Sequence, residues 1–169
     1  LYFSSYPFLG IAVISAVSMI DEITPVAGPA TVVLDPRVLS WEFFIREAPW
    51  VTERDGVYHL TYSGAGADTT CYSIGEATSA SPLGPFERTA PTPVLHDDPE
   101  VGFFGPGHHS ITEGPDGEVM FFHTKDSYLQ GYERHVRWAP VSTDSAGNLR
   151  VDRPVPGEST TGTSSCVPF

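Results

Sequence analysis

A repeat with a period of about sixty residues constrains the fold of this chain more than any other feature of its sequence. Residues 51–56 (VTERDG) resemble residues 111–117 (ITEGPDG), with one insertion, and an apolar run follows the Asp-Gly pair in both segments. Asp-Gly between two apolar runs predicts a tight β-hairpin, because both residues tolerate the positive φ angles that the turn requires. The two segments are therefore expected to form equivalent hairpins.

A second alignment extends the repeat to three copies. Residues 13–18 align with residues 74–79 at an offset of 61 positions, and residues 136–139 align with residues 74–77 at an offset of 62. An apolar segment precedes each of these three aligned segments and would form the strand that pairs with it. In the first copy this segment is residues 1–4, so that copy lacks an opening strand. Units of three or four antiparallel strands at a fixed period predict an all-β protein built from β-propeller blades. A chance resemblance between hairpins of a β-sandwich is the alternative.

The composition supports short strands and limits the partners of the chain. Its 169 residues suffice for one domain with a core. The 16 glycines and 16 prolines favour many turns over long helices. The formal net charge of −12 makes nucleic acid and membranes unfavourable partners and leaves a neutral sugar unaffected. No apolar run approaches the roughly 20 residues of a membrane span.

The two ends and the two cysteines add further expectations. The first residues (LYFSS) resemble the middle of a strand, so we expect that a preceding segment was removed or left out. We divide the chain into a partial propeller, residues 1–153, and a C-terminal tail, residues 154–169, that is rich in Ser, Thr and Gly. Cys71 and Cys166 either form one bridge between the tail and a strand or are two separate thiols.

Four motifs occur in an order that resembles a known enzyme family. They are Glu47-Ala48-Pro49-Trp50, residues 62–64 (YSG), residues 72–86 (YSIGEATSASPLGPF) and residues 105–110 (GPGHHS). Together they resemble glycoside hydrolase family 43, whose members are five-bladed β-propellers that remove arabinofuranosyl or xylosyl units from plant polysaccharides with inversion. Five units of this period need about 300 residues. The resemblance, which spans about residues 1–149, thus implies that this chain is the later part of such a propeller, with about three blades.

Glu47 is the candidate catalytic residue. Pro49 restricts Ala48 to an extended conformation, which predicts that an inner blade strand begins at or before the glutamate. The carboxyl is then expected to face the central channel. A carboxyl that is desolvated near other carboxylates keeps its proton and can donate it to a leaving oxygen. The resemblance implies that role, the general acid, for Glu47. A solvated glutamate at a strand edge is the alternative interpretation.

Other residues are candidate contacts for a sugar. The resemblance implies that His108 lies at the channel centre, helps to orient the site and faces a calcium or sodium ion. We expect contact with the ion through water, because calcium prefers oxygen ligands. Arg134 is expected to present its guanidinium to sugar hydroxyls or a catalytic carboxylate, with a surface ion pair as the alternative. Trp50 and Phe104 could stack on the apolar face of a sugar or belong to the core.

Several neighbouring polar residues are expected to be structural. His109 lies on the opposite face of its strand from His108, and His123 ends a strand and would pack between blades. His96-Asp97-Asp98 resembles a metal-binding cluster, but we interpret it as a solvated loop. No cofactor is required by the chemistry that the resemblance implies.

The general base is not identified. Inverting hydrolysis requires two carboxyls about 6.5–9.5 Å apart, and the resemblance places the base, an aspartate of the first blade, upstream of Leu1. The resemblance also implies a second aspartate upstream of Leu1, which adjusts the pKa of the acid. Asp21 and Asp35 lie in turn-like segments and match neither of these two aspartates. The sequence therefore predicts a glycosidase that acts on an oligo- or polysaccharide, outside the cell rather than in the cytoplasm. Its missing blades would lie in the same protein or in a second chain. The alternatives are a non-catalytic carbohydrate-binding or degenerate propeller module and a structural domain completed by another chain.

Overall fold

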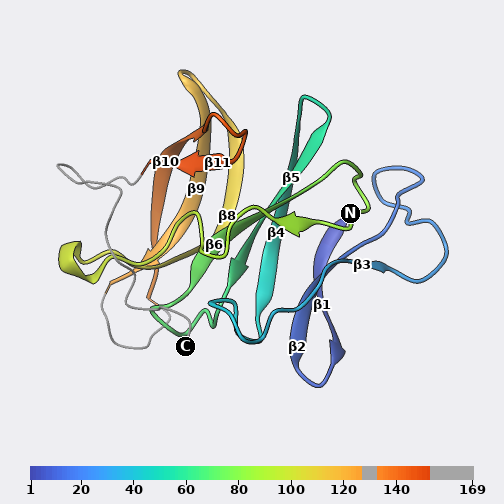
Figure 1. Cartoon of the computed structure of the whole chain (residues 1–169), viewed down its shortest axis with the longest axis horizontal. Helices are drawn as coiled ribbons and strands as arrows, with labels where there is room; N and C mark the ends of the chain where they lie inside the picture. Colours follow the sequence, from blue (N-terminus) through green and yellow to red (C-terminus); the bar gives the residue numbers. More distant parts are fainter. Residues whose placement is uncertain (127–132, 153–169) are drawn as a thin grey trace.

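The computed structural model describes residues 1–126 and 133–152 as three antiparallel β-sheets that stand side by side (Figure 1). The first sheet has the strand order β1 (Tyr2–Phe8), β2 (Ile11–Ala16), β3 (Thr31–Leu34). The second has the order β4 (Arg46–Arg54), β5 (Val57–Gly64), β6 (Ser73–Ser79), β7 (Glu87–Arg88). The third has the order β11 (Leu149–Val151), β10 (His135–Thr143), β9 (Gly117–Lys125), β8 (Phe104–Gly114). The only helix in these residues is the 3₁₀ turn η1 (Pro99–Val101), so no described helix could cross a membrane.

The strand order confirms the blades predicted from the repeat. In every sheet, strands that follow one another in the sequence pair with one another. The first sheet contacts the second through β1 and β2 against β4, and the second contacts the third through β5 and β6 against β8. The first sheet has three strands where the others have four, and its β1–β2 hairpin corresponds to β5–β6 and β9–β10. The strand that it lacks is therefore the opening one, and the described residues form an incomplete β-propeller of three blades.

The two predicted Asp-Gly hairpins are present. Asp55 and Gly56 connect β4 to β5 with φ angles of 52° and 81°, and Gly117 begins β9 with a φ of 119°. The Glu53 carboxylate accepts a hydrogen bond from the Gly56 backbone N–H at 2.6 Å, which fastens the first turn. Local turn chemistry thus determines where each blade reverses direction.

Hydrophobic clusters lie between neighbouring blades. In the first cluster Trp41 is 4% exposed and lies against Gly64 of β5 and Gly75 of β6. A Cβ atom at either glycine would come within 2.6 Å of the indole ring, so a larger residue would displace it. The second cluster joins Ile74 of the second blade to Met120 of the third. Full burial of an aliphatic or Met side chain of this kind stabilises the fold by about 1.5–3 kcal/mol.

Glu42, in the segment between the first two blades, is buried and holds two arginines. Its carboxylate accepts hydrogen bonds from Arg46 Nε and Arg88 Nη2, both at 2.7 Å, and from the Tyr62 hydroxyl at 2.8 Å. Arg46, which is also buried, donates to the carbonyl oxygen of Ala12 in β2 at 2.9 Å. Burial opposes ionisation, yet the hydrogen bond and charge of Arg88 hold the pKa of the Glu42 carboxyl below its usual value. This network ties the first blade to the second.

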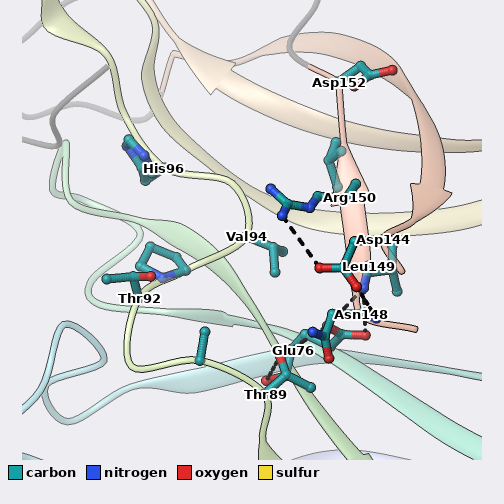
Figure 2. Close-up of a pocket in the computed structure, with 13 residues that line it drawn as sticks. Glu76, Thr89, Thr92, Val94, His96, Asp144, Asn148, Leu149, Arg150 and Asp152 are labelled. Carbon is teal, nitrogen blue, oxygen red and sulfur yellow. Dashed lines mark hydrogen bonds and ion pairs between the residues drawn. The ribbon is translucent and has the colours of Figure 1, made fainter. Parts of the chain in front are cut away.

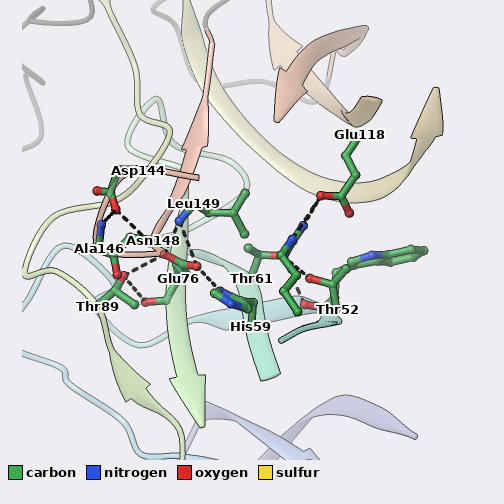
Figure 3. A network of polar contacts seen from close by, with 12 residues as sticks. Thr52, His59, Thr61, Glu76, Thr89, Glu118, Asp144, Ala146, Asn148 and Leu149 are labelled. Carbon is green, nitrogen blue, oxygen red and sulfur yellow. Dashed lines mark hydrogen bonds and ion pairs between the residues drawn. The ribbon is translucent and has the colours of Figure 1, made fainter. Parts of the chain in front are cut away.

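Glu76 of β6 ties the second blade to the third (Figure 3). Its carboxylate oxygens accept hydrogen bonds from the Leu149 backbone N–H at 3.1 and 3.2 Å, and His59 Nδ1 lies 2.8 Å from Oε1. Arg54 of β4 adds a second connection, with Nη2 at 2.5 Å from Oε2 of Glu118 in β9. The blades are therefore joined by buried polar contacts as well as by apolar packing.

One prediction about the start of β4 was wrong. Ala48 is not extended before Pro49 but has a φ of 50°. The pairing of β4 with β5 shifts register between Glu47 and Trp50, so the strand contains a bulge at this point. Sheet pairing on both sides of the bulge overrides the local preference of a residue before proline. The strand still begins before Glu47, as expected.

The segment that resembled a metal cluster is not a solvated loop. Asp97 and Asp98 are buried, because the loop pairs with neighbouring backbone: Leu95 bridges to Ile74, and Asp98 to Phe103. Within residues 1–126 and 133–152, no group of three or more His, Cys, Asp or Glu side chains could hold a metal ion.

The tail and one of the cysteines fall outside the described residues. Cys71 is disulfide-bonded, which answers the question that the sequence left open for this residue. The other cysteine of the chain, Cys166, and the predicted tail, residues 154–169, lie outside the part of the chain that the structure describes.

Candidate active site

The innermost strands of two blades carry the same distortion at the same point of the repeat. The β4 bulge lies between Glu47 and Trp50, and β8 shifts register between Gly107 and Ser110. Within these bulges Ala48 has a φ of 50° and His108, sixty positions later, a φ of 52°. Such a conformation costs a non-glycine residue about 1–2 kcal/mol. Bulges of this kind re-aim side chains and occur next to active sites, so both are candidate site-forming features.

Glu47 is partly buried at the first of these bulges and is held by Tyr72. The Tyr72 hydroxyl donates a hydrogen bond to Glu47 Oε1 at 2.6 Å. Tyr72 is fully buried just before β6. Burial, and then the hydrogen bond to Glu47, raise the pKa of Tyr72 far above its usual value. The phenol therefore stays protonated and acts as a donor to this carboxyl.

The Tyr72 ring is enclosed by the third blade. A Cβ atom at Gly107 would lie 2.0 Å from Tyr72 Cε1, so only glycine admits the ring here. The imidazole of His123 in β9 stacks on the Tyr72 ring, with ring centroids 5.5 Å apart and planes 11° from parallel. His108 stacks in turn on His123 at 6.5 Å and 24°. Gly107, directly before the histidine pair, thus permits the close approach of the third blade to Tyr72.

Ser63 joins the two bulges. It lies opposite Glu47 in the β4–β5 register, and its Oγ accepts a hydrogen bond from the His108 backbone N–H at 2.8 Å. The equivalent pair of the third blade, sixty positions later, is Gly107 opposite His123. The structure thus brings Glu47, Ser63, His108 and His123 to the same end of neighbouring blades.

His109 points away from this group and is buried. Its Nε2 lies 2.6 Å from Thr61 Oγ1, and the Thr61 hydroxyl donates to the carbonyl oxygen of Trp50 at 3.2 Å. Burial lowers the pKa of His109 to about 3, so the imidazole is neutral at pH 7. Through Thr61, its hydrogen bond supports the backbone next to the β4 bulge.

Arg134 lies close to the aromatic stack. Its guanidinium donates to the carbonyl oxygens of Ala67 at 2.5 Å and Glu133 at 3.3 Å. After burial, the charge of Arg134 is the largest cause that lowers the pKa of His123, to about 4, and it also lowers the pKa of Lys125. The predicted arginine is therefore near the site and is anchored by backbone carbonyls of two loops.

The two predicted stacking aromatics occupy different environments. Trp50 follows the bulge on β4 and is 38% exposed. Phe104 begins β8, is partly buried and lies opposite Lys125 in the β8–β9 register. Tyr72 and Ser63 are not among the site residues that the sequence predicts. Both lie inside the four family motifs, but their roles depend on contacts with residues 25 or more positions away.

Neither aspartate considered for the base joins this group. Asp21 is exposed, and its Oδ1 accepts hydrogen bonds from the backbone N–H groups of Ile23 and Thr24 in its own turn. Asp35 is also exposed, next to β3. The catalytic base therefore stays unassigned within the described residues.

A separate hollow of about 280 Å³ lies between the second and third blades (Figure 2). Its walls are the loop after β7, the β10–β11 turn with Asp144 and Asn148, and β11. Glu76 faces it, but the carboxylate of this residue is occupied by Leu149, His59 and Thr89. None of the predicted site residues lines this hollow.

Comparison with known proteins identifies relatives of this fold and sequence. Residues 7–148 match the family described as Glycosyl hydrolases family 43. A beta-D-galactofuranosidase of Aspergillus niger is 33% identical over 90 residues, which cover 53% of this chain and 24% of that enzyme. An extracellular exo-alpha-(1->5)-L-arabinofuranosidase of Streptomyces avermitilis is 31% identical over 110 residues, or 60% of this chain and 22% of that enzyme.

Solved structures agree with these matches. A thermostable family-43 glycoside hydrolase superimposes with a TM-score of 0.83 and 26% identity, over 96% of this chain and 56% of that one. An alpha-L-arabinofuranosidase from Lactobacillus brevis superimposes with a TM-score of 0.78 and 26% identity, over 93% and 52%. The chain thus spans about half the length of these structures and about a quarter of the two matched enzymes.

Proposed function

Because the chain belongs to glycosyl hydrolase family 43, we propose that it supplies the proton-donating half of a glycosidase active centre, with Glu47 as general acid. The substrate would be an arabinofuranosyl or xylosyl linkage of a plant oligo- or polysaccharide. The observation that carries the assignment is the placement of Glu47 on an inner-strand bulge, with Oε1 held by Tyr72.

The mechanism assigns a distinct task to each oxygen of Glu47. Tyr72 fixes Oε1, and Oε2 carries the proton to the glycosidic oxygen as the bond to the leaving group breaks. An inverting reaction needs a second carboxyl to activate water on the opposite face of the sugar, about 6.5–9.5 Å away. We place that base outside the described residues, in the same protein or a second chain. Two carboxyls suffice for this chemistry, and it requires no cofactor.

Four further residues are proposed to contact the sugar. His108 presents its exposed side chain at the second bulge, and Arg134 lies beside the aromatic stack. Trp50, directly after the β4 bulge, and Phe104, at the start of β8, offer aromatic faces. A calcium or sodium ion would meet His108 through water. Two observations favour action outside the cell: Cys71 is disulfide-bonded, and one relative is named extracellular.

Substitution E47Q tests the acid assignment. Two arabinofuranosides would be compared, one with a poor alkyl leaving group and one with a good dinitrophenyl leaving group. Loss of a general acid should lower kcat for the first by about 10²–10⁴-fold and spare the second, which needs no protonation. The matched control is E22Q, on an exposed loop glutamate.

Equal losses for both leaving groups, or no loss, would remove Glu47 from the acid role. Proton NMR of the first-formed product tests inversion independently. If neither the wild-type protein nor E47Q hydrolyses any arabinoside or xyloside but both bind them, the protein is a carbohydrate-binding module instead.

A further inference from the structure

The only lysine of the chain is buried next to the candidate active site. Eight of the nine basic residues are arginines, and Lys125 at the end of β9 is the ninth. Its residue surface is 4% exposed, and its Nζ has no hydrogen-bond partner among the described residues. A buried ammonium without an acceptor is costly, so a fold that keeps one there suggests that another molecule supplies the acceptor.

A second buried nitrogen near Lys125 also lacks a hydrogen-bond partner among the described residues. Nε2 of His123 is buried and also has no hydrogen-bond partner in the part of the chain that the structure describes. Residues 123 and 125 are two positions apart on β9, so their side chains lie on the same face of the strand. Their Cα atoms are about 7 Å apart, a separation that the long lysine side chain can close. The two nitrogens can therefore approach one ligand group.

The electrostatic surroundings of this pair are positive. The charge of Arg134 lowers the pKa of both Lys125 and His123, although burial is the larger cause in each case. The one carboxylate that counteracts this effect on Lys125 belongs to Asp68, which is exposed. In a protein with a net charge of −12, three basic side chains, Lys125, His123 and Arg134, thus lie near the end of β9.

We propose that Lys125, His123 and Arg134 form a binding site for the carboxylate of a uronic acid residue in the polysaccharide. Two carboxylate oxygens match the two unpartnered nitrogens, and the guanidinium supplies a further positive charge. His123 stacks on Tyr72, whose hydroxyl holds Glu47, so the acidic sugar would lie one aromatic ring away from the proton donor.

The side chain of Lys125 can reach such a ligand. Its stem packs against the backbone at Gly105, where a Cβ atom would lie 3.2 Å from Lys125 Cδ. The Nζ atom is shielded from solvent in the free protein, and rotation about the four side-chain bonds turns the ammonium towards an incoming carboxylate. The inference rests on the proposed function, because it names the class of substrate which that site selects.

The test is titration calorimetry on E47Q protein, which binds without turnover. The probes are an arabinoxylo-oligosaccharide with one glucuronic acid branch and the same molecule with that carboxyl reduced to an alcohol. The acidic probe should bind about 10-fold or more tightly, as charge-assisted hydrogen bonds predict. Added K125M should abolish this preference and added K125R should retain it. The exposed Arg150, changed to Met, is the control and should leave it intact.

Protonation offers a second measurement. Since a bound carboxylate favours the charged imidazole, the preference should grow as the pH falls from 7 to 5. Equal affinity for the two probes, or a preference that survives in K125M, would overturn the carboxylate site. Equal binding of both probes together with normal leaving-group behaviour of E47Q would refute this inference alone. Failure to bind either probe would refute both proposals. Circular dichroism establishes that each variant is folded.

Discussion

Replacement of Gly107 by alanine tests whether the third blade positions Tyr72 for its contact with Glu47. The new Cβ atom would lie 2.0 Å from Tyr72 Cε1 and 2.3 Å from Cδ1, whereas ordinary carbon contacts begin near 3.4 Å. The ring must therefore shift by more than an ångström. It is held by the stack with His123 and by the 2.6 Å hydrogen bond to Glu47, so the shift breaks that bond.

The expected loss in the free energy of unfolding follows from the overpacked ring and from the broken hydrogen bond. Overpacking a core site costs about 1–3 kcal/mol, and leaving the buried Tyr72 hydroxyl without its acceptor costs about 1–3 kcal/mol. We expect G107A to lower the free energy of unfolding by about 3–5 kcal/mol, measured by urea denaturation. Gly147→Ala is the control. It places a Cβ atom in open space at a φ of 83°, so its cost is backbone strain alone, about 1 kcal/mol.

A double-mutant cycle decides whether the ring is the cause. In a Tyr72→Ala background the new methyl group has no ring to meet, so G107A should cost less than about 1 kcal/mol. If G107A costs the same in both backgrounds, or no more than Gly147→Ala in the wild type, the contact with Tyr72 does not explain why glycine occupies this position.

Three further predictions concern stability. E42Q should lower the free energy of unfolding by about 3–5 kcal/mol, because Arg46 and Arg88 then lose the buried counter-charge that Glu42 provides. The control E22Q, in an exposed loop, should change this free energy little in the same urea titration. His109 takes up a proton near pH 6.5 when unfolded but only near pH 3 when folded, so the unfolded state binds more protons between these values. Stability should therefore fall by about 1.4 kcal/mol for each pH unit below 6.5, and the slope should flatten in H109Q; an unchanged slope would assign the effect to other groups. Reduction of the Cys71 disulfide should cost about 2–4 kcal/mol, visible as a lower melting temperature with reductant; an unchanged melting temperature would exclude a stabilising bridge.

Much of the architecture could be predicted from the sequence because blade hairpins are determined locally. Asp55-Gly56 adopts the positive φ angles of its turn whatever surrounds it, and the same chemistry recurs sixty residues later. The period of that signal predicted three blades and the strand that the first blade lacks, and both predictions are confirmed. The sequence predicts Glu47 for a similar reason, since it stands in a short motif at the start of an inner strand.

The contacts that give Glu47 its surroundings were decided only in three dimensions. Tyr72 meets Glu47 across 25 residues, and Gly107 admits the Tyr72 ring from the next blade. No local pattern encodes a distance between side chains on different blades. The positive φ of Ala48 also contradicts the preference of a residue before proline, because pairing of β4 with β5 outweighs it. Tertiary structure also overrides the usual preference of lysine, which is normally a surface residue. The packing of β9 against its neighbours buries Lys125 and leaves its ammonium without an acceptor among the described residues.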